Sequence, residues 1–326
     1  GRTITIVPNK SLVTQTEEDF VACNLDVGVY YGDRKEVGRY NTIATWQSLN
    51  VLEKKAKNEH STEFKEFCEG INTVIIDEVH MAKADVLKRL LTGPFAHCGI
   101  RWGLTGTVPK ADYEFMGIKC SIGEVANRIQ ASELQDKGVL ANCHVNVLQT
   151  QDHPQFKTYA EELKWLTTDT TRMTWIANTI KDIATSGNTL ILVDRISAGQ
   201  MLEKKIKDSV FVSGSTKNVD RKEQYDEVST ATNKVIIATY GVASVGINIP
   251  RIFNLVLIEP GKSFVRVIQS IGRGIRKAED KENVQIWDIT SSCKFAKRHL
   301  GARKKFYKEA NYPYNIEKVN YENPYT

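Results

Sequence analysis

The stretch Asn-Thr-Val-Ile-Ile-Asp-Glu-Val-His at residues 72–80 decides the fold, because it joins an apolar run to two adjacent carboxylates. A continuous run rich in β-branched residues is typical of a parallel strand that is covered on both faces. Ligands of α/β proteins bind beyond the carboxyl ends of such strands. There Asp77 can hold Mg²⁺ through its oxygens, and Glu78 can orient or deprotonate an attacking water. The same string also fits a plain structural interpretation, since acidic residues often end strands and cap the following helix.

Composition narrows the class of protein. The chain has 326 residues, of which 41% are hydrophobic and 25% charged, as expected for a globular protein with two domains. It contains no apolar stretch of 18 or more residues, so we expect neither a membrane span nor a membrane partner. The six cysteines form no Cys-x-x-Cys pair, which argues against a zinc site or a disulfide framework. A reducing cytoplasm is the predicted compartment.

A mild excess of positive charge suits a polyanionic partner. The net charge is +5 and the isoelectric point is about 8.7. Residues 291–310 concentrate this excess, with seven Lys and Arg residues against Glu309 alone. Two interpretations stay open for this segment: a solvated helix near the end of the chain, or a surface that contacts phosphates.

Strand-like and helix-like segments alternate along the whole chain, which predicts parallel α/β layers. Strands are expected at 3–7, 42–45, 73–77, 100–104, 144–148, 189–193, 210–212, 234–238, 254–258 and 285–289. Helices are expected near 11–23, 61–69, 83–91, 156–167, 172–185, 198–207, 221–229 and 265–271. The two halves echo each other, so we predict two related lobes, residues 1–138 and 139–326.

Seven short motifs follow one another at the predicted strand tips. They are Ile-Val-Pro-Asn-Lys-Ser-Leu at 6–12, Ala-Thr-Trp-Gln-Ser at 44–48, Asp-Glu-Val-His at 77–80, Gly-Leu-Thr-Gly-Thr at 103–107, Phe-Val-Ser-Gly-Ser-Thr at 211–216, Ala-Thr-Tyr-Gly-Val-Ala-Ser-Val-Gly-Ile-Asn-Ile-Pro at 238–250 and Gln-Ser-Ile-Gly-Arg-Gly-Ile-Arg at 269–276. This ordered set resembles the superfamily-two helicases and translocases, in their DExH branch. The resemblance implies two RecA-like lobes, each a mostly parallel sheet flanked by helices.

Within that superfamily, the chain is most similar to phage recombination and repair helicases of the UvsW type. The motifs at 103–107 and 269–273 favour DNA enzymes over DEAD-box RNA helicases, whose third motif is usually Ser-Ala-Thr. The resemblance implies an ATP-dependent helicase or translocase that acts on single-stranded and branched DNA, with branch migration as its task. The cytoplasm of an infected bacterium is the compartment that it implies.

The resemblance also implies a site for ATP and Mg²⁺. Asp77 and Glu78 would hold the metal and position water, and His80 would couple this site to the other lobe by a hydrogen bond. Arg276 would act as an arginine finger on the γ-phosphate, with Arg273 as its partner. Further nucleotide contacts are expected from Gln269, Gly246 and Asn248. Most relatives have Asp where this chain has Asn248, which leaves that contact open. Plain alternatives are a locally satisfied histidine at a helix start and two solvated arginines.

DNA contacts are expected from backbone N–H groups and small hydroxyls, because such an enzyme steps along any sequence. The candidates are Pro8, Lys10, Thr45, Trp46 and Gln47 in the first lobe and Arg195, Ser213, Gly214, Thr239 and Gly241 in the second. Trp46 is as well explained by packing beneath its strand tip as by stacking on a base. Thr105 and Thr107 would relay the nucleotide state to the DNA track, or simply belong to a β-turn.

A phosphate loop of the pattern GxxxxGK[ST] is not found in the sequence. Gly261-Lys262-Ser263 does not complete it, because Val256 stands where the first glycine is needed. We expect the loop upstream of Gly1. Two rival functions stay open: a DNA-binding scaffold that does not hydrolyse ATP, and an RNA helicase.

Overall fold

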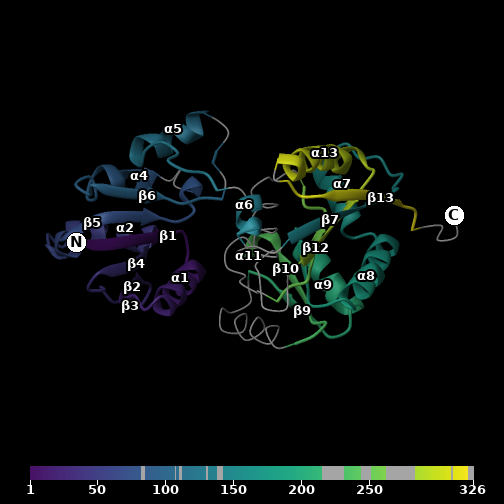
Figure 1. Ribbon diagram of the computed structural model, residues 1–326, viewed down its shortest axis with the longest axis horizontal. Helices are drawn as coiled ribbons and strands as arrows, with labels where there is room; N and C mark the ends of the chain where they lie inside the picture. Colours follow the sequence, from purple (N-terminus) through teal and green to yellow (C-terminus); the bar gives the residue numbers. More distant parts are fainter. Residues whose placement is uncertain are drawn as a thin grey trace. The chain divides into compact units, whose positions relative to one another are not determined.

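The computed structural model describes residues 1–81, 85–106, 108–109, 112–129, 131–137, 142–214, 231–243, 251–261, 283–309 and 311–321. The chain forms two compact units, Gly1–Asn127 and Arg128–Thr326, each built on its own sheet (Figure 1). The lobe boundary predicted at 138/139 falls on residues outside the described ranges and stays a prediction. No helix within the described ranges is long and apolar enough to cross a bilayer.

The described part of the first unit contains six strands and the helices that connect or follow them. The strands are β1 (Arg2–Val7), β2 (Val27–Tyr31), β3 (Arg34–Lys35), β4 (Asn41–Thr45), β5 (Ile71–Ile76) and β6 (Ile100–Gly103). The helices are α1 (Lys10–Ala22), α2 (Trp46–Asn58), α3 (Glu63–Cys68), the short 3₁₀ helix η1 (Val79–Met81), α4 (Asp85–Thr92) and α5 (Asp112–Ser121). The strand order is β3-β2-β4-β1-β5-β6, and every neighbouring pair is parallel except β2 and β3.

Alternation along these strands divides the apolar side chains between two faces of the sheet. Ile4 and Ile6 contribute to the core cluster formed with α2, α3 and α4. Val7, Val29 and Ile43 point to the other face, where they pack with Leu12 and Val13 of α1. Asn9 begins α1, because its side chain accepts a hydrogen bond from the Leu12 N–H at 3.1 Å. Helices therefore cover both faces of the sheet.

The second unit is built on a sheet of seven strands. They are β7 (Asn142–Thr150), β8 (Thr189–Val193), β9 (Ser209–Val212), β10 (Val235–Thr239), β11 (Asn254–Ile258), β12 (Asn283–Ser291) and β13 (Tyr314–Val319). The described helices are α6 (Ala131–Asp136), α7 (Tyr159–Leu166), α8 (Thr170–Ala184), α9 (Ile196–Lys205), α11 (Tyr240–Ala243) and α13 (Lys294–Glu309). The order is β13-β7-β12-β11-β8-β10-β9, with all neighbours parallel.

Two core clusters lie on opposite faces of this sheet. Leu300, Phe306 and Tyr307 of α13 belong to one cluster. The other cluster contains Ile176 of α8 and Leu202 of α9. Figure 1 shows α13 on one side of the second sheet and α8 and α9 on the other. Every residue of β8 and β11 is buried, as expected for central parallel strands covered on both faces.

The predicted α/β class with two mostly parallel, helix-flanked sheets is confirmed. Strands predicted at 189–193 and 254–258 have the predicted bounds, whereas β5 ends at Ile76, one residue earlier than expected. Helices α2 and α5 and strands β2, β3 and β13 were not predicted. The helices expected at 221–229 and 265–271 lie outside the described residues.

Candidate functional site

The register of the first sheet brings four predicted motifs to a single edge. Val7 of β1 lies opposite Thr45 of β4, and Ile6 of β1 lies opposite Ile76 of β5. Ile76 in turn lies opposite Gly103 of β6. Because these strands are parallel, the residues that follow them all leave the sheet at its carboxyl edge. The motifs at 6–12, 44–48, 77–80 and 103–107 therefore begin side by side.

The turn at Asp77 and Glu78 is fixed by its backbone. The Asp77 N–H donates to the Ile6 carbonyl at 3.0 Å, which extends the pairing of β5 with β1 by one residue. The Glu78 N–H donates to Asp77 Oδ1 at 2.9 Å. Glu78 has φ of +51°, a left-handed conformation that costs free energy in a residue other than glycine. Such strain concentrates at functional sites.

His80 connects the acidic turn to the third motif of the unit. Its Nδ1 lies 2.8 Å from Thr105 Oγ1 and 3.3 Å from Glu78 Oε2. A carboxylate oxygen near Nδ1 favours the tautomer in which this nitrogen carries the proton and donates. The side chains of His80 and Glu78 are 14% and 18% exposed, so the contact is shielded from most of the solvent. Glu78, His80 and Thr105 thus form one polar cluster within the first unit.

Backbone hydrogen bonds hold the same two loops together. The Leu104 N–H donates to the Ile76 carbonyl at 2.8 Å, and the Val79 N–H donates to the Leu104 carbonyl at 2.9 Å. A Cβ placed on Gly103 would lie 3.1 Å from both methyl groups of Val79, so a side chain there would crowd the turn. The two motifs are therefore coupled through backbone, packing and side chains.

The donor set suits Mg²⁺ together with phosphates better than a metal held by protein alone. Within the part of the chain that the structure describes, no group of three or more His, Cys, Asp or Glu residues could hold a metal ion. Mg²⁺ is usually bound through one or two carboxylates plus phosphate oxygens and waters. Asp77 and Glu78 supply such a pair of carboxylates at a strand tip.

Four of the five predicted DNA contacts of the first unit lie at the start of α2 or bond to it, and Lys10 begins α1. Thr45 caps this helix, because its hydroxyl accepts a hydrogen bond from the Ser48 N–H at 3.2 Å. Gln47 donates from Nε2 to the carbonyl of the buried Pro8 at 2.9 Å, which joins two motifs. Trp46 is half-buried and packs against the core, as the packing interpretation expects. Lys10 is exposed, with Nζ 5.6 Å from the centre of the Tyr31 ring.

The predicted contacts of the second unit also lie at one carboxyl edge. Strands β8, β10 and β9 are neighbours, with Val193 opposite Thr239 and Ala238 opposite Val212. The candidates that end or follow these strands are Arg195, Ser213, Gly214, Thr239 and Gly241. Ser213 is buried, Gly214 and Gly241 are exposed, and the Thr239 hydroxyl accepts a hydrogen bond from the Val242 N–H at 3.4 Å.

Six predicted site residues lie outside the described residues: Thr107, Gly246, Asn248, Gln269, Arg273 and Arg276. Their roles stay predictions.

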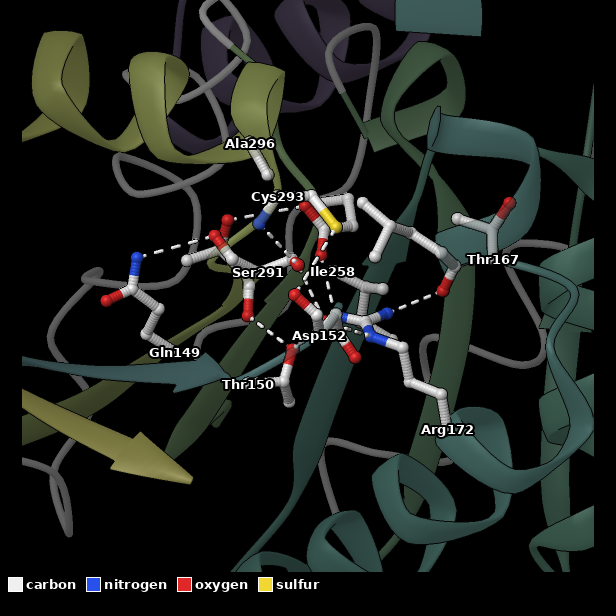
Figure 2. Close-up of polar contacts among 12 residues, drawn as sticks. Gln149, Thr150, Asp152, Thr167, Arg172, Ile258, Ser291, Cys293 and Ala296 are labelled. Carbon is white, nitrogen blue, oxygen red and sulfur yellow. Dashed lines mark hydrogen bonds and ion pairs between the residues drawn. The ribbon is translucent and has the colours of Figure 1, made fainter. Parts of the chain in front are cut away.

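A buried ionic network in the second unit was not predicted. Figure 2 shows the side chains of Thr150, Ser291 and Arg172 converging on Asp152. Thr150 and Ser291 donate to Asp152 Oδ2 at 2.6 Å each, and Arg172 Nε lies 3.4 Å from the same oxygen. Arg172 also donates from Nη2 to Glu259 Oε1 at 2.6 Å. Its side chain has no exposed surface.

Glu259 follows β11 at the same carboxyl edge as the predicted DNA contacts. The sequence signal was present, since an acidic residue follows an apolar run here just as it does at Asp77. Burial raises the pKa of Glu259 to about 7; Arg172 and Arg303 oppose this shift, and Asp152 and Asp288 add to it. The Arg172 guanidinium is shared by the carboxylates of Asp152 and Glu259, which leaves an excess of negative charge. This excess is consistent with retention of a proton by Glu259.

Two family models match most of the chain. One, described as the res subunit of type III restriction enzymes, matches residues 1–110, and the other, the helicase conserved C-terminal domain, matches residues 171–278. The first match includes the motifs at 6–12, 44–48, 77–80 and 103–107, and the second includes the motifs at 211–216, 238–250 and 269–276. The chain belongs to the superfamily-two helicases.

The following relatives are similar to this chain and longer than it. The ATP-dependent DNA helicase UvsW of phage T4 is 26% identical, and the alignment covers 94% of this chain and 62% of UvsW. A putative helicase of a Sulfolobus islandicus filamentous virus is 27% identical over 72% of this chain and 45% of its own length. The chain therefore spans less than two thirds of the length of these relatives.

Solved structures show the same fold at low identity. Dbp5 of S. cerevisiae, in a structure with RNA and ADP BeF3, superimposes with a TM-score of 0.65 at 14% identity. The superposition covers 99% of this chain and 78% of the Dbp5 chain. At this identity the likeness describes the architecture alone.

Proposed function

We propose that this protein is an ATP-dependent DNA helicase or translocase that remodels branched DNA. Forks and four-way junctions would be its substrates, and branch migration in phage-type replication, recombination and repair its task. The observation that carries the proposal is the cluster of Glu78, His80 and Thr105 at the carboxyl edge of the first sheet. The similarity to a phage DNA helicase favours DNA over RNA. The same similarity favours the cytoplasm of an infected bacterium as its compartment.

The acidic turn would serve ATP hydrolysis. Asp77 would hold Mg²⁺, which when bound supplies positive charge against the phosphates. Glu78 would orient the attacking water and accept its proton. Its strained backbone and its contact with His80 restrict the directions in which the carboxylate can point. Arg276 and Arg273 would offset charge on the γ-phosphate, and Gln269, Gly246 and Asn248 would contact the nucleotide.

The contact between His80 and Thr105 would couple hydrolysis to DNA. A movement of Glu78 would displace His80 Nδ1 and, through it, the Thr105 hydroxyl, because these groups are in contact. Thr105 belongs to the loop that follows β6, and Thr107, which lies outside the described residues, would share its role. A link from His80 to the other lobe is a further part of the proposal.

The strand tips of both units would hold one DNA strand. Their donors are backbone N–H groups, small hydroxyls and an amide, which suit phosphates and sugars and carry no base preference. In the first unit, Gln47 donates to the Pro8 carbonyl, and Thr45 caps the helix that contains Gln47. Arg195, Ser213 and Thr239 lie on adjacent strand ends in the second.

The test is a comparison of substrates with the protein translated from the complete reading frame. ATP hydrolysis and strand separation are measured with forked, four-way and linear DNA and with RNA of the same sequences. We expect turnover to be stimulated by DNA, and most strongly by the branched forms. Stimulation by RNA alone would favour an RNA helicase, and DNA binding without hydrolysis would favour a scaffold.

Arg276 offers a second test in the same protein. Replacing Arg276 by Ala is expected to lower the rate of hydrolysis by at least about 10²-fold, because a finger arginine contributes about 10³–10⁵. Lys277→Ala is the matched control, since it removes a neighbouring positive charge. If Arg276→Ala changes the rate of hydrolysis by less than about threefold, Arg276 does not act as an arginine finger.

A further inference from the structure

Helix α13 presents two opposite stripes of side chains. The stripe toward the sheet is buried and consists of Ala296, His299, Leu300, Arg303, Phe306 and Tyr307. The other stripe, here called the basic stripe, consists of Lys294, Lys297, Arg298, Lys304, Lys305 and Lys308. Lys304 is half-buried and the other five residues are exposed. Spacings of three and four residues place each set on its own side of the helix.

Among the residues that the structure describes, the basic stripe forms no ion pair. Lys294 and Arg298 lie over the Phe295 ring, at 5.5 and 5.8 Å from its centre. Exposed cations that form no ion pair remain available to attract an external polyanion.

Buried contacts hold the helix firmly beneath this stripe. Arg303 forms hydrogen bonds to both carboxylate oxygens of Asp288 at 2.9 Å and donates to the Gly261 carbonyl at 2.7 Å. The Glu162 carboxylate of α7 accepts the N–H groups of Phe295 and Ala296 at 3.1 and 2.7 Å, which caps the start of the helix. The cations are therefore carried by a preorganised element, so ordering them on binding costs less.

The stripe starts at the edge of the sheet that carries the predicted DNA contacts. Helix α13 follows the carboxyl end of β12, and β12 lies two strands from β8, whose tip leads to Arg195. Two strand spacings amount to about 10 Å. From Lys294 to Lys308 the helix rises about 21 Å. That length matches about six phosphates of one DNA strand at about 3.4 Å of axial rise each.

We propose that the basic stripe of α13 binds the phosphate backbone of a duplex DNA arm, next to the strand track of the second unit. This inference rests on the proposed function, in which DNA is the substrate. The basic stripe consists of lysines and one arginine, with no Asn or Gln side chains between them. This composition suits contacts with phosphates and not with base edges. An anionic membrane is a poorer fit, because the apolar side of α13 is already buried against the sheet.

The test is a charge reversal with a matched control. One variant combines Lys297→Glu, Lys305→Glu and Lys308→Glu, all at exposed positions of the stripe. The control combines Lys54→Glu, Lys65→Glu and Lys204→Glu, which are exposed on α2, α3 and α9 and change the net charge equally. Affinities for a duplex and for a single strand of equal length are measured without ATP over a series of salt concentrations.

We expect the stripe variant to bind duplex about 100-fold more weakly than the original protein near 0.1 M salt. The slope of log affinity against log salt concentration should become shallower by about 2.7, because three phosphate contacts are lost. The change on the single strand should be smaller, and the control should stay within about threefold of the original protein. Replacing the same three lysines by Arg should preserve duplex affinity. Unchanged melting temperatures would show that all variants fold.

Three results would overturn the inference: an unchanged duplex slope, an equal loss in the control, or a loss on single strands at least as large as on duplex. An unchanged salt dependence of duplex affinity would instead favour an acidic protein as the partner of the stripe. These outcomes are separable from the proposed function, because they require no hydrolysis. Conversely, a lack of DNA-stimulated ATP turnover would refute the motor and leave duplex binding by the stripe intact.

Discussion

Nδ1 of His80 lies 2.8 Å from Oγ1 of Thr105, which joins the acidic turn after β5 to the loop after β6. The same nitrogen lies 3.3 Å from Glu78 Oε2. A single imidazole therefore contacts both the proposed water-positioning carboxylate and a hydroxyl of the next motif. If this contact transmits the nucleotide state, its loss should weaken coupling more than it weakens folding.

Replacing Thr105 by Val removes the hydroxyl and keeps the shape of the side chain. We expect DNA stimulation of ATP hydrolysis to fall by about fivefold, corresponding to about 1 kcal/mol of coupling, while hydrolysis without DNA changes little. Thr5→Val is the matched control, because the buried Thr5 hydroxyl has no hydrogen-bond partner among the described residues. Equal DNA stimulation of hydrolysis in both variants would show that the contact between His80 and Thr105 does not transmit the nucleotide state.

Glu259 should make the stability of the second unit depend on pH. Its pKa in the folded protein is raised to about 7 from 4.5 by burial, so the folded state retains a proton that the unfolded state releases. Stability attributable to this group is therefore highest below about pH 4.5, falls as the pH rises to about 7, and is constant above. The full loss is at most about 3 kcal/mol.

The Glu259→Gln variant should lack this part of the pH dependence, since an amide does not titrate in that range. Denaturant unfolding at pH 5 and pH 7.5 measures it, with Glu309→Gln at an exposed position as the control. The loss of stability between the two pH values should be smaller in Glu259→Gln than in the control. The same loss in both variants would mean that Glu259 is ionised throughout.

Arg303 should be critical for folding, although it belongs to a basic run. It is buried and shares two hydrogen bonds with Asp288, which also accepts the Tyr307 hydroxyl at 2.9 Å. Arg303→Met would leave a buried carboxylate without its counter-charge and is expected to cost about 3–5 kcal/mol in the free energy of unfolding. Lys305→Met, two residues away on the exposed side, should stay within about 0.5 kcal/mol.

A double variant separates the charge effect from lost packing. Asp288→Leu combined with Arg303→Met removes both charges, and we expect it to regain much of the lost stability. Thermal or denaturant unfolding of the three variants provides the comparison. A double variant no more stable than Arg303→Met alone would assign the cost to packing.

The elements predicted from sequence are those whose patterns are local. β8 and β11 are uninterrupted apolar runs after their first residues, Thr189 and Asn254, and their bounds were predicted to the residue. β13 is an edge strand whose middle residues are exposed and partly charged, so no apolar run marks it. In α2, Val51 is exposed whereas Glu53 is buried, so the apolar pattern of this helix is broken on both sides.

The buried charges could not be predicted because their partners are distant in sequence. Arg172 meets Glu259 across 87 positions, and only the order of the strands brings them together. Arg303 was counted with the neighbouring lysines by charge alone, although its spacing of three residues from Leu300 and Phe306 places it on the buried side of the helix. By contrast, the strand-tip motifs could be placed on one edge as soon as the strands were assumed to be parallel.

The role of Glu78 can be measured directly in the protein translated from the complete reading frame. DNA-stimulated ATP hydrolysis and nucleotide affinity are compared between the original protein and Glu78→Gln, which keeps the size of the side chain and removes its charge. We predict that hydrolysis falls by about 10²–10⁴-fold while nucleotide affinity stays the same. Turnover within about threefold of the original protein would contradict the assignment of Glu78 to the chemistry of ATP hydrolysis.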